Sequence, residues 1–242
     1  MKTLVISDIH ANLEALKTVL DAAGEVDAVW CLGDVVGYGP NPNECVDLLR
    51  KQPNLICLLG NHDAACIGKM SVETFNLEAR LAVDWTKSVL TLENREFLLE
   101  RPETVVHNEV TLAHGSPREP VYEYLLDVQT AKENFAYFSN DYCFIGHSHL
   151  PLMFASSNGQ DDTRLVFPPP HTTIQLKPRA IVNPGSVGQP RDRDPRAAFA
   201  IYDDVEYTWE HKRVEYDIQA TQRAMREVAL PERHIERLAS GW

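Results

Sequence analysis

The first third of the chain alternates short apolar runs with amphipathic stretches. Runs rich in β-branched residues at 3–8, 27–34 and 54–61 are typical of buried strands. Between them, residues 12–24 and 42–51 place apolar side chains at helical spacing. Strands that alternate with helices in this way predict βαβ units built around a parallel sheet.

The middle of the chain continues with both kinds of pattern. Residues 73–100 carry apolar positions at helical spacing and predict two helices with a break near Thr91. The runs at 103–115 and 141–150 are strand-like, and a further helix is expected over 128–138. This region therefore extends the α/β pattern of the first third.

Beyond residue 150 the pattern changes to short β runs with turn signals, which predicts a more antiparallel second half. Within it, residues 156–176 are rich in turn signals and include three consecutive prolines, so we expect an added hairpin bordering a cleft. Residues from about 217 to 240 predict two short amphipathic helices. No repeat or linker divides the chain, so we expect one domain over residues 1–242.

The composition is that of an ordinary globular protein, because 44% of the 242 residues are hydrophobic and 24% are charged. This excludes a disordered tail, a collagen-like repeat and a disulfide-stapled miniprotein. The formal net charge is −12, which would repel phosphate backbones. We therefore expect no broad binding to nucleic acids.

The five cysteines show no CxxC spacing, and three of them lie inside apolar runs. An odd, unpatterned set favours reduced thiols in a reducing compartment. The N-terminal apolar run is too short for a signal sequence, and no run approaches the roughly 18 residues that span a membrane. We therefore expect a soluble, cytoplasmic protein without a membrane partner.

Polar side chains that can bind metal follow five apolar runs. In an open α/β sheet, ligands bind beyond the carboxyl ends of the strands, so side chains far apart in sequence can meet there. The five motifs are Asp8-Ile9-His10, Gly33-Asp34, Gly60-Asn61-His62-Asp63, His114-Gly115 and Gly146-His147-Ser148-His149.

Each motif has an ordinary structural explanation when it is taken alone. Asp8 suits the N-terminal cap of a helix, and Gly33-Asp34 suits a turn. His147 and His149 are harder to explain, because alternation along an extended chain points both toward one face. The joint occurrence of all five motifs favours one shared functional site.

The motifs supply carboxylates, one amide and imidazoles, without thiolates. Mixed nitrogen and oxygen ligands suit divalent Mn, Fe, Zn, Co or Ni, of which we favour Mn. Seven such side chains exceed a mononuclear site and suit two ions, which can hold a bridging hydroxide and clamp a phosphoryl group. His62 is then spare and is placed as a general acid for the leaving oxygen, with Asp63 holding its tautomer.

The ordered series of motifs, from about Lys2 to Asp203, resembles the calcineurin-like metallophosphoesterases. The resemblance implies an α/β fold, a four-layer αββα sandwich of two mixed β-sheets flanked by helices. It also implies His62 as proton donor and Asp63 as its orienting acid. The implied ligands are Asp8, His10, Asp34 and His149 for the first metal, and Asp34 as a bridge with Asn61, His114 and His147 for the second.

Two segments differ between branches of the family and bear on the substrate. Protein Ser/Thr phosphatases carry G-D-x-x-D-R-G, whose arginine grips phosphate, whereas residues 33–39 read GDVVGYG and leave Tyr38 near the site without an assigned role. The stretch that begins at Asn183, NPGS, is closer to the small prokaryotic phosphoesterases. Asn12 either caps a helix or contacts substrate.

Three arginines form a basic cluster in this acidic chain. Arg191, Arg193 and Arg196 could clamp a phosphate at the edge of the cleft, with Arg191 the best placed. Alternatively, they lie in a solvated loop and pair with Asp192 and Asp194. Both interpretations are open at the level of sequence.

The sequence therefore predicts a dinuclear phosphoesterase acting on phosphodiesters or on small phosphorylated or nucleotide substrates, with diesters favoured over monoesters. Two divalent ions would outweigh the two carboxylates and a hydroxide, so an anionic substrate remains compatible with the acidic chain. The alternatives are a phosphomonoesterase or protein phosphatase-like enzyme, a nuclease, and a non-catalytic metal-binding interaction module on the same fold.

Overall fold

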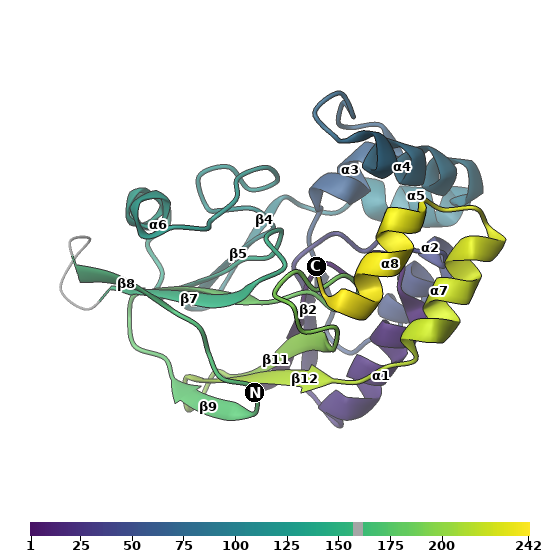
Figure 1. Cartoon of the computed structure of the whole chain (residues 1–242). Helices are drawn as coiled ribbons and strands as arrows, with labels where there is room; N and C mark the ends of the chain where they lie inside the picture. The colour runs from purple at the N-terminus through teal and green to yellow at the C-terminus, as the bar shows by residue number, and fades with distance from the viewer. Residues whose placement is uncertain (157–161) are drawn as a thin grey trace.

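A computed structural model describes residues 1–156 and 162–242 of the chain. Two mixed β-sheets of six strands pack face to face, and helices cover both outer faces (Figure 1). These four layers confirm the predicted αββα sandwich.

The first sheet has the strand order β3-β2-β1-β11-β12-β9. Strands β1, β2 and β3 run parallel, and the other pairs are antiparallel. The bounds are β1 Lys2–Ile6, β2 Ala28–Cys31, β3 Ile56–Cys57, β9 Thr172–Gln175, β11 Ala197–Asp203 and β12 Thr208–Val214.

The second sheet has the order β4-β5-β6-β10-β7-β8, in which β5, β6 and β10 are parallel. Its bounds are β4 Thr104–His107, β5 Val110–Ala113, β6 Tyr142–Phe144, β7 Pro151–Ser156, β8 Thr163–Val166 and β10 Ala180–Pro184. Five of these six parallel strands, all except β10, lead into the five motifs.

Strand β1 shows why its sequence is apolar at consecutive positions. Leu4 and Ile6 face the helices that cover the first sheet, whereas Val5 faces the core between the two sheets. Both faces of the strand are therefore buried, as in parallel sheets covered on both sides. Large aromatic side chains, including Trp30, Phe144 and Trp209, fill the space between the sheets.

Helices from both ends of the chain lie on the first sheet's side, and one helix covers the second sheet (Figure 1). Thr91 caps α5 at the predicted helix break. The sequence did not predict α3, which begins inside the third motif. The bounds are α1 Leu13–Ala23, α2 Pro42–Leu49, α3 Asn61–Ile67, α4 Leu77–Val89, α5 Leu92–Leu99, α6 Val128–Asn134, α7 Ile218–Glu227 and α8 Glu232–Ser240.

The structure corrects the hairpin predicted for residues 156–176, of which 157–161 lie outside the described residues. Strand β8 pairs with β7 at the edge of the second sheet, whereas β9 pairs with β12 at the edge of the first. The two strands do not pair with each other, because each completes a different sheet.

Two further observations concern the whole described chain. None of its helices is both long and apolar enough to cross a membrane. The side chains of all five cysteines are buried and carry free thiols.

Candidate metal centre

Seven side chains from the five motifs meet where parallel strands of both sheets end. Asp8 and His10 follow β1, Asp34 follows β2, and Asn61 opens α3 directly after β3. His114 follows β5, and the last two histidines of the set follow β6. All seven are buried, with at most 7% of any residue exposed.

The backbone at five of these positions is left-handed. The φ angles of these non-glycine residues lie between 48° and 63°, a region that side chains with a Cβ seldom adopt. Such conformations cluster at functional sites. The five residues are Asp8, His10, Asp34, His147 and His149.

This backbone corrects the expectation that His147 and His149 alternate along an extended chain. Strand β6 ends at Phe144, and both histidines lie in the turn that follows it. The turn sends the two imidazoles to different neighbours. They therefore belong to two separate groups of candidate ligands.

In each group, the three candidate ligand atoms lie within 4.8 Å of one another. The first group comes from the loops after β1 and β6, and the second from the loops after β2, β5 and β6. The groups are Asp8, His10 and His149, and Asp34, His114 and His147.

One carboxylate oxygen lies between the two groups. Asp34 Oδ2 is 3.6 Å from Nε2 of His10 in the first group and 3.4 Å from Nε2 of His114 in the second. Asn61 Oδ1 lies 3.1 Å from the same His114 nitrogen. Asp34 can therefore contribute to both groups, and Asn61 can contribute to the second.

Main-chain carbonyls fix one ring nitrogen of each of the four histidines. A carbonyl accepts a hydrogen bond only from a protonated nitrogen, so the other nitrogen of each neutral ring carries a lone pair. The pairs are His10 Nδ1 with Val36 (3.2 Å), His114 Nδ1 with Leu32 (2.8 Å), His149 Nδ1 with Gln189 (2.6 Å) and His147 Nε2 with Tyr122 (3.2 Å).

Nitrogen lone pairs of different histidines face one another, and this arrangement indicates whether the site suits a metal ion. The Nε2 atoms of His10 and His149 lie 3.2 Å apart although both Nδ1 atoms are committed to carbonyls. Among the described residues, the buried atoms Asp8 Oδ1 and Asp34 Oδ2 have no hydrogen-bond partner. Buried acceptors without donors are costly, and a cation between them satisfies all of them.

Burial also keeps most of these imidazoles in the neutral form that binds metal. It lowers the pKa of His10 and His149 well below the ordinary value, and the pKa of His147 to about 3. For His114, burial likewise lowers the pKa, but the charge of Asp34 outweighs it and raises the pKa to about 9. A cation at Asp34 would compete with that proton.

His62 lies outside both groups but beside them. Its ring packs 4.3 Å from the Tyr38 ring and 4.9 Å from the Phe75 ring, centroid to centroid, and 4.9 Å from the His10 ring. Its main-chain N–H donates to Asp34 Oδ1 at 2.8 Å. The imidazole is therefore held next to the candidate metal ligands.

The expected contact between Asp63 and the His62 ring is absent. Asp63 accepts hydrogen bonds from the amides of Val36 (3.0 Å) and Gly60 (3.1 Å). Among the described residues, His62 Nδ1 has no hydrogen-bond partner. Asp63 therefore holds two loops together and does not fix the tautomer of the histidine, because its carboxylate points to the backbone.

Asn12 is a helix cap in the structure and not part of the open site. Its Oδ1 accepts from the amide of Ala15 at the start of α1, and its Nδ2 donates to the carbonyl of Gly188. Tyr38, by contrast, lies at the site, with its ring 4.7 Å from the His10 ring.

The three arginines of the predicted basic cluster have different surroundings. Arg196 pairs with Asp194, which is the solvated-loop arrangement, and Arg193 lies over the ring of Trp242. Arg191 lies toward the site, with its guanidinium 6.0 Å from the centre of the Tyr38 ring. Of the three, Arg191 is the arginine that lies beside a residue of the site.

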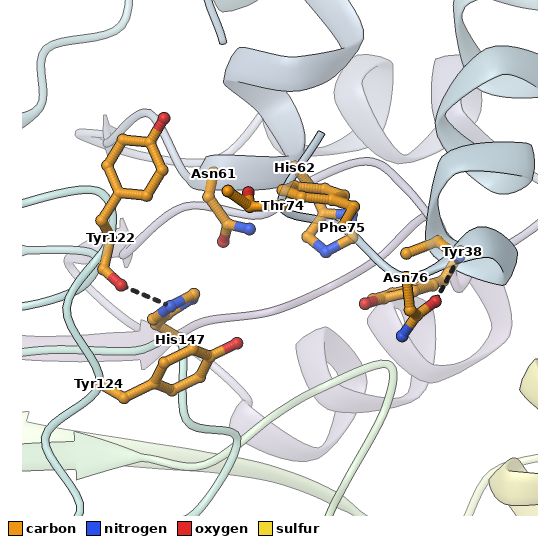
Figure 2. A pocket seen from close by; sticks show the side chains of 10 residues that line it. Tyr38, Asn61, His62, Thr74, Phe75, Asn76, Tyr122, Tyr124 and His147 are labelled. Atoms are coloured by element: carbon orange, nitrogen blue, oxygen red, sulfur yellow. Dashed lines mark hydrogen bonds between the residues drawn. The ribbon is translucent and has the colours of Figure 1, made fainter. Parts of the chain in front are cut away.

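A cavity of about 340 Å³ opens beside His62 and His147 (Figure 2). Aromatic side chains that the motifs did not reveal form its walls: Phe75 packs on His62, and Tyr124 stacks on His147 with the ring centroids 3.8 Å apart. A tyrosine-rich stretch was the only sequence signal for Tyr124. The cavity places an aromatic-walled space next to the candidate ligands.

Comparisons with known proteins agree with this geometry. Residues 1–206 match the family model for the calcineurin-like phosphoesterase superfamily domain. An uncharacterized protein of Methanocaldococcus jannaschii is 38% identical over 244 residues, which cover 98% of this chain and 97% of the relative. The crystal structure of a metallophosphoesterase from Sphaerobacter thermophilus is 44% identical and superposes with a TM-score of 0.92, covering 100% of this chain and 99% of that one.

A shorter match involves a relative with a printed activity. The symmetrical bis(5'-nucleosyl)-tetraphosphatase of Pseudomonas fluorescens is 30% identical over 113 residues. The match covers 44% of this chain and 38% of that relative. It therefore compares less than half of each protein.

Proposed function

Because the chain belongs to the calcineurin-like phosphoesterase superfamily, we propose that its two ligand groups form one dinuclear centre that hydrolyses phosphoric esters. The observation that carries the proposal is the position of Asp34 Oδ2, which lies within 3.6 Å of a histidine nitrogen from each group. A carboxylate in this position can bridge two neighbouring ions, which lie about 3.5–4 Å apart in two-metal sites.

Each residue of the centre has a role in this proposal. Asp8, His10 and His149 would hold one divalent ion, and Asn61, His114 and His147 the other, with Asp34 shared by both. When bound, such ions supply Lewis acidity toward phosphoryl oxygens and activate water at neutral pH. Nitrogen and oxygen donors without thiolate suit Mn, Fe, Zn, Co or Ni, and we favour Mn.

His62 is placed to handle the proton of the leaving group. Its ring lies beside the centre but belongs to neither ligand group, and Tyr38 and Phe75 pack against it. These rings restrict the motion of the imidazole and keep water from one side of it. We therefore assign to His62 the donation of a proton to the leaving oxygen.

The cavity supports a small organic phosphate as the substrate. Its volume of about 340 Å³ lies in the range of small-molecule pockets, and Phe75, Tyr122 and Tyr124 contribute to its walls. Aromatic walls suit a planar or apolar leaving group. A diester carries two organic groups on the phosphorus and a monoester carries one, so a diester can leave one group in the cavity while the other departs. We therefore propose phosphodiesters, including nucleotide-type substrates, over simple monoesters.

The test is a substrate panel with protein reconstituted with Mn, Zn or no metal. Bis(p-nitrophenyl) phosphate, p-nitrophenyl phosphate, a dinucleoside polyphosphate and a phosphopeptide represent the competing classes. We expect metal-dependent turnover with a higher kcat/KM on the diester than on the monoester. Turnover without metal, or turnover of the phosphopeptide alone, would overturn the proposal.

A further inference from the structure

The C-terminal helix α8 brings a second arginine next to Arg191. Gln189, which is buried, accepts hydrogen bonds at its side-chain oxygen from Arg191 Nη2 (3.1 Å) and from Arg237 Nη1 (3.4 Å). One neutral oxygen thus lies between two positive charges. Helix α8 lies beyond residues 1–206, so Arg237 falls outside the part of the chain that matches the family model.

Neither arginine has a side-chain counter-ion. Within residues 1–156 and 162–242, no Asp or Glu carboxylate lies within 4.0 Å of the guanidinium of Arg191 or Arg237. The nearby acids are already engaged, because Asp192 pairs with Arg213 and Asp194 with Arg196. Two guanidinium groups at one place, with no described Asp or Glu side chain paired to them, concentrate positive charge in a chain of net charge −12.

The hydrogen-bond donors of the two guanidinium groups also indicate that an anion could bind here. The buried Nε of Arg191 has no hydrogen-bond partner among the described residues. Arg237 donates its own Nε to the main-chain oxygen of Trp242 at 2.6 Å, which fixes the orientation of its guanidinium. Burial, and then the charge of Arg191, lowers the pKa of Arg237, as expected for a partly buried cation beside another cation.

The arginine pair is attached to the candidate metal centre. The main-chain oxygen of Gln189 accepts the Nδ1–H of His149 at 2.6 Å, while the side chain of the same residue holds both arginines. The guanidinium of Arg191 lies 6.0 Å from the centre of the Tyr38 ring, which is 4.7 Å from the His10 ring. The pair therefore lies on the other side of the Tyr38 ring from His10 or beside it, one residue away from the candidate ligands.

Helix α8 is anchored at this position. Ile235 and Leu238 are buried in one cluster with Tyr38 and Ala79, and the ring of His234 lies 4.5 Å from the Tyr38 ring. The helix therefore packs on the same tyrosine that borders the candidate ligands. Arg237 is presented by a fixed element and not by a fraying terminus.

We propose that Arg191 and Arg237 form an anion site for a second phosphoryl group, adjacent to the phosphoryl group that is cleaved. The inference rests on the proposed function, which assigns the cleaved phosphoryl group to the dinuclear centre. Guanidinium groups bind phosphate oxygens through two parallel hydrogen bonds, and two such groups match the charge of a further phosphoryl group. Within the substrate class of the proposed function, a second anion site favours nucleotide-type substrates with a phosphoanhydride, such as a nucleoside polyphosphate, over a diester with a single phosphate.

Binding of inorganic diphosphate to the metal-free protein tests this site without turnover. Isothermal titration calorimetry should show binding to the unaltered chain that weakens about tenfold or more in Arg237→Ala. Arg233→Ala is the matched control, because Arg233 lies on the same helix with 74% of its side chain exposed. Arg237→Lys, which keeps the charge, should recover part of the affinity and covers the case in which the alanine variant unfolds.

Kinetics with the metal-loaded protein provide the second arm. For Arg237→Ala, kcat/KM on a dinucleoside polyphosphate should fall at least tenfold more than kcat/KM on bis(p-nitrophenyl) phosphate. Equal losses on both substrates, equal losses in Arg233→Ala, or no diphosphate binding by the unaltered chain would overturn the inference. If one of these results occurs while the unaltered protein still hydrolyses the diester, only the anion site is contradicted. If the unaltered protein does not hydrolyse the diester, the proposed function itself is contradicted.

Discussion

Asp63 and His62 are adjacent in sequence, yet the carboxylate of Asp63 binds the backbone and not the histidine ring. Its two oxygens accept from the amides of Val36 and Gly60 at 3.0 and 3.1 Å. These bonds join the loop after β2 to the start of α3. They set the position from which the main-chain N–H of His62 donates to Asp34 Oδ1 at 2.8 Å.

His62→Asn should lower kcat far more than it lowers metal content. The imidazole belongs to neither ligand group, and general acid catalysis typically contributes about 10²–10⁴-fold. A nitrophenolate leaves readily without a proton, so its ester should lose least, and an ester with an alkoxide leaving group should lose most. Steady-state kinetics on both esters, with metal content measured alongside, provide the check.

Asp34→Asn is the matched comparison for His62→Asn, because it alters the carboxylate between the two groups. We expect it to lose metal and activity on every substrate. A His62→Asn protein that lost metal in the same way, or slowed both esters equally, would contradict the proton-donor role.

Asp63→Asn should lower the free energy of unfolding. Any effect of this variant on kcat should be the same for esters with good and poor leaving groups. An amide offers one acceptor oxygen, so its NH2 group would face one of the two backbone N–H donors. Leaving that buried donor unpaired costs about 1–3 kcal/mol. Denaturant unfolding measures the loss, and a leaving-group effect like that of His62→Asn would contradict the backbone role.

The convergence of the five motifs could be predicted because parallel strands end at a common edge of their sheet. That argument placed Asp8 and Asp34 correctly at the ends of β1 and β2. It needed no side-chain geometry, only the apolar runs and the polar residues after them. The αββα sandwich followed from the resemblance of the motif series to a family.

Features that depend on local backbone or on distant packing could not be predicted. The left-handed turn at His147 and His149 is invisible to periodicity, because non-glycine residues rarely adopt positive φ. Tyr124 and Arg237 lie in segments without a metal-binding motif, and tertiary packing brings them to His147 and Gln189, respectively. Asp63 was misassigned because adjacency in sequence does not imply that two side chains meet.

Metal should stabilise the protein as well as activate it. The buried oxygens Asp8 Oδ1 and Asp34 Oδ2, which lack hydrogen-bond donors among the described residues, gain partners when cations bind. Ligands that bind only the folded state raise its stability, by about 2.7 kcal/mol at 100 times Kd. Reconstitution should give two ions per chain and raise Tm above that of chelated protein, and full activity in metal-free protein would contradict the centre.

All five cysteines should titrate as free thiols after denaturation under non-reducing conditions. In the native protein they should react slowly, because every one is buried and burial raises the pKa of Cys45 and Cys66 well above the ordinary value. Thiol titration with and without denaturant measures both quantities. Three or fewer thiols in fresh denatured protein would show that a disulfide forms.

Gly60 is needed for space and not for an unusual backbone angle. Its φ is −90°, which any residue adopts, but a Cβ at this position would overlap Asp34 Oδ1 and the amide nitrogen of Asp34. Gly24 offers the opposite case: its φ is 67°, and no atom of the described residues, apart from its chain neighbours, lies within 4 Å of an added Cβ. Substitution of Gly60 therefore tests the effect of a steric clash, and substitution of Gly24 tests the effect of backbone strain.

Gly60→Ala should move Asp34 and thereby remove metal from both groups, because the displaced carboxylate lies between them. We expect metal content to fall well below two ions per chain and kcat/KM to fall about 10–100-fold, because Gly60 packs against the shared ligand and fixes its position. Gly24→Ala should cost about 1–3 kcal/mol of stability through its φ of 67° and ψ of −151°, and it should leave metal content unchanged. Metal analysis and thermal unfolding of both variants distinguish the two effects. If Gly60→Ala kept both ions and lost only stability, the close packing against Asp34 would not be what positions the centre.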